Sequence, residues 1–359
     1  MRGASCRPPR TGPGPAAGRW WLRRRSASVL IEPRVVLVGV LLLIGIVCLG
    51  ILALRVGSFA LEWGEILQAL RGRGGRATTL VVTRWRAPRI LLAIGAGAAL
   101  AAAGQAFQVV TRNPLGSPDL IGFSTGAQTG ILLAVLVLPV NMVAVSLASL
   151  LGGGLAGAAV LVLSRRGGFG GLRLVLGGIA ISSMLESLNR WLIVRVDSDT
   201  AFGALRAVTG TLAAARWSVT LPALVGIAAV LVPMTRLDRS CRVLLLGQDV
   251  AVGLGVNATG VRLALVMGGT LLVALVTMAA GPIGFVALIA PHLARGLAGR
   301  AVPPLILTAA TGALLLLMSD IATQAVLESL PVGVATSAVG GAYLMVVLTV
   351  AARSRKVLR

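Results

Sequence analysis

Residues 84–122 read Arg84-Trp85-Arg86-Ala87-Pro88-Arg89, then an uncharged apolar run to Val110, then Thr111-Arg112-Asn113-Pro114-Leu115-Gly116-Ser117-Pro118-Asp119-Leu120-Ile121-Gly122. Residues 90–110 are about long enough to cross a hydrocarbon core of roughly 30 Å at about 1.5 Å per residue. The small residues in this run let neighbouring backbones approach closely, which predicts a helix packed against other helices. The two prolines then interrupt the helix, because proline has no backbone N–H and restricts the residue before it. Such a break near a membrane is tolerated only where protein or a watery cavity satisfies the freed backbone groups.

The composition is that of an all-α polytopic membrane protein. Of the 359 residues, 57% are hydrophobic and only 12% are charged, which leaves too little polar surface to cover a soluble core. The formal net charge is +22. The arginines are nevertheless scattered between apolar segments and build no basic aromatic surface, so nucleic acid is not an expected partner. We interpret them as anchors to membrane lipid, as the positive-inside rule describes.

Lysine, histidine and cysteine are rare, which limits the chemistry that this chain can carry. A phosphate-binding loop needs a lysine after glycine, and the single lysine is Lys356, near the C-terminus. Cys6, Cys48 and Cys241 lie far apart in the sequence, so neither a disulfide framework nor a metal site is implied. His292 is the single histidine, and we expect it to cap or pack. The chain is therefore predicted to have no ATPase, metal or cofactor of its own and not to be an enzyme.

Apolar segments predict about ten membrane-spanning helices. They cover about residues 35–54, 89–110, 120–137, 142–163, 172–194, 217–234, 261–279, 285–295, 305–326 and 334–352. The Arg-rich, Pro-rich and Gly-rich residues 1–30 predict a disordered basic tail, followed by a permease domain over 31–352 and a second basic tail over 353–359. The basic flanks place both termini in the cytoplasm of a multi-pass protein of the cell membrane. The first apolar run is too long for an ordinary signal peptide, so a retained span is favoured.

The fifth predicted span carries an acid and a base at its middle depth. Glu186 and Arg190 lie four residues apart on one helical face, with the acid first, which is the favourable order for an ion pair. Charges inside a membrane normally pair with each other or face water. Two interpretations stay open: a structural pair, or a polar face on a translocation path together with Ser182, Ser183 and Asn189.

Residues 235–262 form the longest polar cytoplasmic stretch between predicted spans. A connection between two spans could be much shorter, so we expect another protein to dock on this stretch, about residues 235–260. Its centre reads Leu246-Gly247-Gln248-Asp249-Val250-Ala251-Val252-Gly253-Leu254-Gly255. This pattern predicts a short helix bounded by glycines.

A short internal repeat relates the two halves of the chain. Residues 113–122 superpose on residues 281–290 at a constant offset of 168. The repeat places helix breaks at Pro114, Gly116, Pro282 and Gly284. Because five spans separate the breaks, one falls inside and the other outside, so the halves would be inverted. Paired breaks in inverted halves indicate a central pathway in transporters.

Several motifs resemble the permease subunits of ABC importers for iron-siderophores, haem and cobalamin. They are Arg86-x-Pro88-Arg89, Gly97-Ala98-Ala99-Leu100-Ala101-x-Ala103-Gly104-x-x-x-Gln108, Asn113 to Ala127, Gly247 to Gly255, Pro291-His292-x-x-Arg295, and Glu328 to Gly333. The resemblance covers roughly residues 84–350. The amino-acid sequence of residues 113–127 is most similar to that of the second permease of ferric-enterobactin-type systems.

The resemblance implies an inverted-repeat fold of the cobalamin-permease type and a ferric siderophore as substrate, with haem or cobalamin as the alternative. It implies an ABC ATPase dimer on the inner loop, at Gly247, Gln248, Asp249, Ala251, Gly253 and Gly255. It also implies an extracytoplasmic siderophore-binding lipoprotein that docks on Arg86 and Arg89, since a planar guanidinium suits carboxylates.

One departure from the family pattern concerns the second permease subunit. The family often has Asp-x-x-x-Arg at the outer end of span nine, whereas this chain has Asp320 followed by Gln324. A non-identical permease could supply the missing charge, which favours a heterodimer with a paralogue over a homodimer. Two rival functions remain: an ion-coupled secondary transporter, for which Asp320 or Glu186 would be the carboxylate, and a membrane scaffold without transport.

Overall fold

The computed structural model describes residues 20–24, 27–57, 59, 61–118, 122–137, 142–165, 171–195, 209–326 and 330–357. Within this part of the chain, ten helices fall on the ten predicted spans. They are α1 (Pro33–Ala53), α4 (Ala87–Thr111), α5 (Phe123–Val137), α6 (Met142–Arg165), α7 (Gly171–Val194), α9 (Trp217–Thr235), α12 (Ala258–Ala280), α13 (Val286–Ala298), α14 (Leu305–Val326) and α15 (Val332–Val357). The prediction of an all-α polytopic fold is confirmed, and five helices are long and apolar enough to cross a membrane by length and composition.

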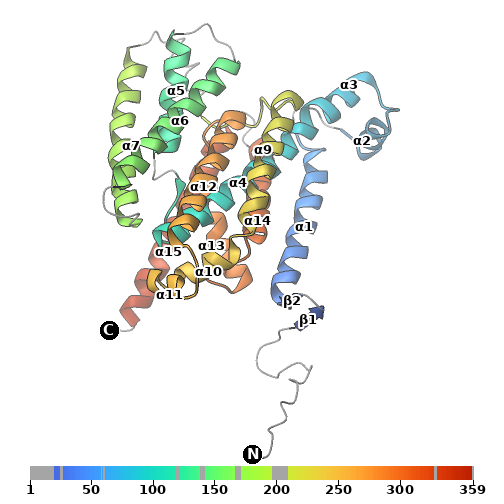
Figure 1. Ribbon diagram of the computed structural model, residues 1–359. Coiled ribbons are helices and arrows are strands. Elements are labelled where there is room, and N and C mark those ends of the chain that lie inside the picture. Colours follow the sequence, from blue (N-terminus) through green and yellow to red (C-terminus); the bar gives the residue numbers. More distant parts are fainter. Residues whose placement is uncertain are drawn as a thin grey trace, which may run out of the picture.

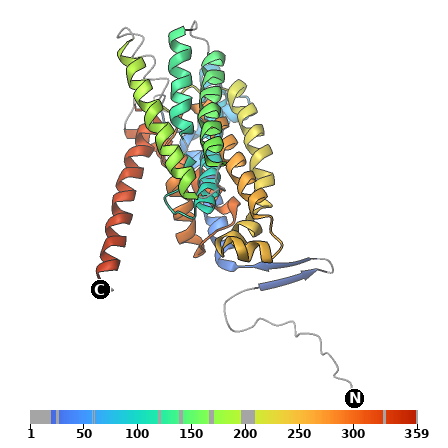
Figure 2. The same cartoon turned by 60° about the vertical axis from the view of Figure 1, so that its left-hand side comes forward.

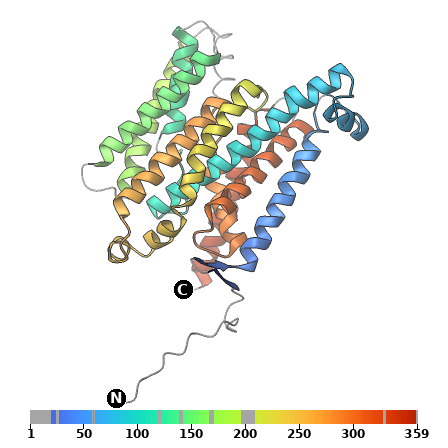
Figure 3. The ribbon, with the colours of Figure 1, turned by 45° about the vertical axis from the view of Figure 1, so that its right-hand side comes forward.

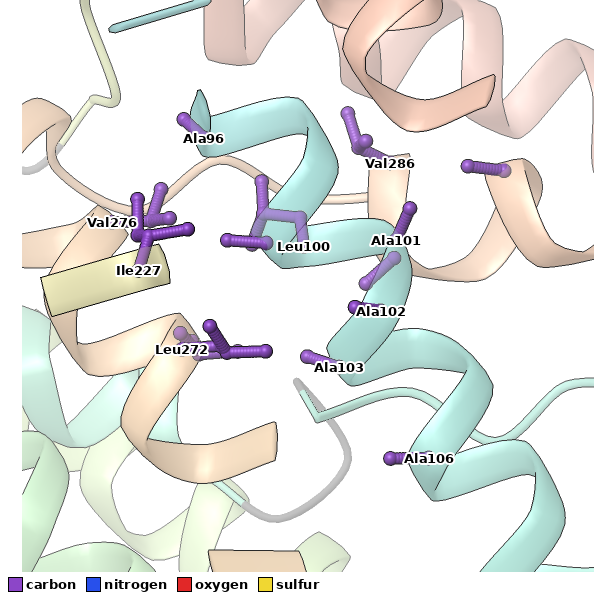
Figure 4. Packing of buried hydrophobic residues seen from close by; sticks show 14 of the residues in the cluster. Ala96, Leu100, Ala101, Ala102, Ala103, Ala106, Ile227, Leu272, Val276 and Val286 are labelled. Carbon is purple, nitrogen blue, oxygen red and sulfur yellow. The ribbon is translucent and has the colours of Figure 1, made fainter. Parts of the chain in front are cut away.

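Helix α4 is the centre of the molecule. It runs obliquely between α9 and α12 on one side and α14 and α1 on the other (Figure 3). Its alanines and Leu100 contact Ile227 of α9 and Leu272 of α12, with Val286 of α13 nearby (Figure 4). Almost every α4 residue from Leu92 to Val110 is buried, as expected for a helix whose small side chains admit close neighbours.

Two glycines of α4 set the closest helix crossings. A Cβ on Gly104 would lie 1.7 Å from the carbonyl oxygen of Ala287 in α13. A Cβ on Gly97 would lie 2.3 Å from the carbonyl oxygen of Gly312 in α14. Real Cβ atoms do not approach backbone this closely, so these crossings exist only because both positions lack a side chain.

Helices α5, α6 and α7 form a second group that leans on α12 (Figures 1 and 2). Gly126 and Gly130 of α5 face Gly152 and Ala148 of α6, where an added Cβ would meet backbone at 2.0–2.5 Å. Helix α15 packs on α13 and α14 and extends away from the bundle toward its C-terminal end (Figure 2).

The connecting elements gather at opposite ends of the bundle. Helices α10 (Asp238–Leu245) and α11 (Gln248–Gly253) lie at the same end as the start of α1 and the C-terminal end of α15, whereas α2 (Trp63–Leu70) and α3 (Arg76–Leu80) lie at the other end (Figure 1). This arrangement is the one expected if α10, α11 and both chain ends share one side of the membrane.

The structure differs from the sequence-based expectation in three places. Residues 20–24 and 27–31, nearly all of which fall in the stretch 1–30 expected to be disordered, form the antiparallel strands β1 (Trp20–Arg24) and β2 (Ala27–Ile31), and their Trp, Val, Leu and Ile residues favour strands. The stretch between the first two predicted spans turns helical at Arg76, and residues 76–111 form one long helix through the π-helical segment η1 (Val81–Arg86).

Helix α13 has 13 residues, or about 20 Å at about 1.5 Å per residue, so it is shorter than the hydrocarbon core, as was the short eighth span predicted over 285–295. The third difference concerns the C-terminal tail. The predicted tail over 353–359 is helical as far as Val357. Residues 1–19 of the predicted N-terminal tail and residues 358–359 of the predicted C-terminal tail lie outside the described residues.

Candidate functional site

A cavity of about 810 Å³ is lined by residues of η1 and of the segment that leads into α9, among others. The start of α9 lies at the end of the bundle opposite α10 and α11 (Figure 1). Residues from η1, α4, the segment before α9, and the ends of α14 and α15 line the cavity. Its polar lining includes Arg86, Arg89, Arg216 and Gln324, and its aromatic lining includes Phe59 and Trp85. The lining residues in the described part of the chain include three arginines and no acid.

Arg86 lies inside the protein at this cavity and is only 7% exposed. Its guanidinium donates hydrogen bonds to the carbonyl oxygens of Leu54 and Phe59. Gly57, with a φ of 134°, lets the connecting backbone fold around this side chain, since a Cβ there would lie 3.2 Å from Nη2. Arg86 thus holds the connection after α1 against η1.

Arg89 is held by a buried carboxylate. Its Nη2 lies 2.8 Å from Oδ1 of Asp320, and its Nε donates to both carboxylate oxygens at 3.0 and 3.1 Å. The Asp320 side chain is 0% exposed and that of Arg89 is 24% exposed. Gln324, at the position where the family often has arginine, donates from Nε2 to Oδ2 of Asp320 at 2.8 Å. Both arginines predicted to receive a binding protein therefore lie at the cavity, but their donors are largely engaged within the chain.

The second predicted break adjoins this cavity. After α12 ends, Gly281 has a φ of 73° and Phe285 a φ of 65°, so residues 281–285 are not helical. The freed groups find backbone partners: Thr211 N donates to Ala280 O at 2.7 Å, and Gly333 N donates to Gly210 O at 3.0 Å. The segment at residues 210–211 thus hydrogen-bonds both to the end of α12 and to the start of α15, as freed backbone groups near a membrane need partners. Pro282 and Gly284 lie within this break.

The first predicted break lies at the opposite end, between α4 and α5. Arg112 ends α4 with a φ of 51°, and the Asn113 Oδ1 and carbonyl oxygen accept hydrogen bonds from the N–H groups of Leu115 and Gly116, each at 2.9 Å. Pro114 lies inside this turn. Arg112 Nη2 also donates to Leu244 O of α10 at 3.3 Å. This contact joins the break to the inner loop.

The predicted polar face of α7 divides into two. Arg190 Nη2 contacts Glu186 Oε1 at 2.7 Å, with side chains 78% and 58% exposed, and Ser183 is exposed on the same side. Asn189 instead is buried and donates to Thr125 O of α5 at 3.3 Å. Ser182 points at Gly122, 2.9 Å from where a Cβ would lie. The ion pair is therefore formed, and it faces away from the rest of this chain.

The loop over residues 235–260 presents a short helix and an apolar surface. Helix α11 lies between Gly247, with a φ of 121°, and Gly255, with a φ of 77°. Large apolar side chains around it are exposed: Leu246 66%, Val250 47%, Val252 60% and Leu254 62%. Asp249 is also exposed, whereas Ala251 is buried. Gln248 Oε1 accepts from Arg262 Nη1 at 3.0 Å. An exposed apolar patch of this kind is typical of a surface that contacts a protein partner or a membrane.

Helix α10 anchors this loop to the bundle through a contact that the sequence analysis missed. The Asp238 carboxylate accepts the Leu305 N–H through both oxygens at 3.1 Å and so caps the start of α14. Burial raises the pKa of the Asp238 carboxyl, while this hydrogen bond and Arg242 act in the opposite direction. The capped helix starts 67 residues away, so no local pattern could have indicated the pair.

We expect Cys241 to resist alkylation in the folded protein. Burial raises the pKa of this thiol to about 12, with Asp238 adding to the shift. Because the thiolate is the nucleophile, the reactive fraction at pH 8 should be about a thousandfold smaller than for an ordinary thiol. Mass spectrometry after iodoacetamide treatment, in mild detergent and after denaturation, would measure this. Equal labelling in both states would contradict the buried position.

His292 packs as expected. Its ring lies edge-on to Tyr343 at 5.8 Å between centroids, and its Nδ1 lies 3.3 Å from Arg295 Nη2. Among the residues that the structure describes, no cluster of three or more His, Cys, Asp or Glu side chains could hold a metal ion.

Comparison with known proteins agrees with this geometry. Residues 37–350 match the FecCD transport family. The chain is 39% identical, over 91% of its length and 100% of the relative, to the ferric enterobactin transport system permease protein FepG of Escherichia coli strain K12. It is 30% identical, over 90% of its length and 98% of the relative, to the Fe(3+)-citrate import system permease protein YfmE of Bacillus subtilis strain 168.

A solved structure of a metal-chelate type ABC transporter in an inward-facing conformation has the same fold. It superposes with a TM-score of 0.76 and 25% identity, covering 88% of this chain and 99% of that chain. The comparisons therefore assign the apolar helices, the two breaks and the surfaces at opposite ends of the bundle to a known family. This chain belongs to the FecCD transport family of permeases.

Proposed function

We propose that this chain is one of two permease subunits of an ABC importer that carries a ferric siderophore into the cytoplasm. A dimer of separate ATPase subunits would bind the inner surface, and an extracytoplasmic siderophore-binding lipoprotein would dock over the cavity that Arg86 and Arg89 border. The observation that carries the proposal is the exposed apolar surface around α11 on a chain with no nucleotide-binding motif. The siderophore substrate is inferred from what FepG and YfmE are named for.

The exposed face of α7 supports a second permease subunit. An ion pair that faced lipid would be costly, so charged groups inside a membrane normally face a watery cavity or a protein partner. Glu186 and Arg190 are paired and largely exposed in the single chain. We therefore place Ser183 and Glu186 on the translocation path between the two permeases, whereas Ser182 and Asn189 contribute to the packing of α7 on α5.

Replacing Gly253 by leucine tests the ATPase contact. No atom lies within 4 Å of a Cβ at this position, so the side chain should not disturb the permease but should obstruct a closely docked partner. We expect co-purification of the ATPase to fall at least about tenfold, equivalent to about 1.4 kcal/mol, with the amount of inserted permease unchanged.

The matched control is Gly64→Leu in α2, where nothing lies within 4 Å either but the position is at the opposite end of the bundle. Retention of the ATPase by both variants would refute the assignment of α11. Uptake of iron-labelled catecholate, hydroxamate and citrate chelates, with haem and cobalamin in parallel, would identify the substrate in the reconstituted importer. Uptake of haem or cobalamin alone would overturn the siderophore proposal.

A further inference from the structure

We propose that Arg216 is the cation through which the outer cavity binds a carboxylate on the extracytoplasmic binding protein. The inference rests on the proposed function and adds a residue to it. Arg216 lines the same cavity as Arg86 and Arg89, but it comes from the segment before α9 and was not among the residues that the sequence indicated.

The three arginines of the cavity are in different states. Arg86 is buried and donates to two carbonyl oxygens, and the charge of Arg89 is balanced by Asp320. Arg216 is exposed, and no carboxylate of the described residues lies within ion-pairing distance of it. Of the three cavity arginines, Arg216 is therefore the one whose guanidinium can take a carboxylate from outside without breaking an ion pair or a backbone hydrogen bond recorded among the described residues.

The backbone around Arg216 is firmly held, although its side chain is exposed. Its carbonyl oxygen accepts the N–H groups of Val219 at 3.0 Å and Thr220 at 2.8 Å at the start of α9. The next residue, Trp217, donates from Nε1 to Thr83 O at 2.8 Å. Shortly before it, Leu212 is 1% exposed. A cation on an anchored backbone loses less freedom on binding than one on a mobile loop.

The surroundings favour a protein partner over a free small anion. Trp85 is 61% exposed and Phe59 is 60% exposed, and both line the cavity. Binding hot spots between proteins are enriched in tryptophan and arginine, and an exposed tryptophan and an arginine line this cavity together. A guanidinium can also bind a carboxylate side chain through two parallel hydrogen bonds.

Arg216 also accounts for the departure at Gln324. Gln324 lines the same cavity as Arg216, and its amide donates to Asp320, so it satisfies that carboxylate without adding a charge. A positive charge from the segment before α9 then takes the place of one from α14 within the same chain. The missing charge need not come from the second permease.

The test uses the complete importer in nanodiscs and the ferric-chelate-loaded binding protein of the same transport system. We expect Arg216→Glu to weaken binding at low salt at least about tenfold, and Arg216→Lys to weaken it less, because lysine keeps the charge and loses the bidentate geometry. ATP hydrolysis without the binding protein should be unchanged. Adding Gln324→Arg to Arg216→Glu should restore part of the affinity.

The matched control is Arg73→Glu, an exposed arginine between α2 and α3 that does not line the cavity. Equal affinities for Arg216→Glu and Arg73→Glu would overturn the role of Arg216 while leaving the importer function intact. If the loaded binding protein neither bound the wild-type importer nor stimulated its ATP hydrolysis, the proposed function itself would fail. The two failures are thus distinguishable.

Discussion

Gly104→Ala is expected to destabilise the protein by at least about 3 kcal/mol, near the upper end of the range for overpacked cores. The added Cβ would lie 1.7 Å from Ala287 O and 2.6 Å from Ala287 C. Neither atom belongs to a flexible side chain, so α4 and α13 would have to separate. Because α13 begins at the second break, that separation should also disturb the backbone hydrogen bonds of residues 210, 211 and 333.

Thermal unfolding in detergent, followed by the loss of monodisperse protein, would measure the effect. Gly154→Ala in α6 is the matched control, since no atom lies within 4 Å of a Cβ there and the helix propensity of the new residue is the same. Unfolding temperatures that agree for the two variants would show that α4 and α13 do not cross at Gly104.

Asp320→Ala is expected to cost about 3 kcal/mol of stability, the lower end of the range for removing one member of a buried ion pair. The change would leave Arg89 without its carboxylate at a partly exposed site and Gln324 Nε2 without its acceptor. The double variant Arg89→Leu/Asp320→Leu should be less destabilised than the sum of its single changes, because no unpaired charge remains. Additive effects in this double-mutant cycle would contradict a direct pair.

The same double variant separates the importer from an ion-coupled secondary transporter. A transported proton or sodium ion would need a membrane carboxylate that is free to bind it, whereas Asp320 is 0% exposed and engaged by two donors. We expect the double variant to retain ATP-driven uptake, provided that it folds. Uptake by the wild-type chain alone in liposomes, driven by an imposed ion gradient, would contradict the importer proposal.

The sequence predicted the spans and the breaks well because both are local properties. Hydrophobic length determines where a helix can cross a membrane, and the prolines at 114 and 282 prevent the adjoining helices from continuing. Glycines 247 and 255 bound α11 in the structure as the pattern predicted, because both adopt positive φ values that favour glycine. Residues 76–83, expected to belong to a connection between two spans, are helical instead.

The roles of the outer arginines could not be predicted in this way. Arg89 and Asp320 are 231 residues apart, and Arg86 reaches backbone 32 and 27 residues away. A signal for Arg216 was present, since an arginine beside a tryptophan on a connection predicted to lie outside runs against the usual inward bias of positive charge. Only the shared cavity relates that arginine to α4 and α14.

By itself, the sequence determined that this chain is a multi-span helical permease with two helix breaks, a long polar loop bounded by glycines and no ATPase motif. These properties depend on hydrophobic length, proline and glycine placement and the absence of residue types, all of which are read from neighbouring positions. The tertiary structure alone decided that Arg86 and Arg89 are engaged within the chain. A guanidinium is satisfied by whatever oxygen the folded chain brings within about 3 Å, and sequence separation does not specify that distance.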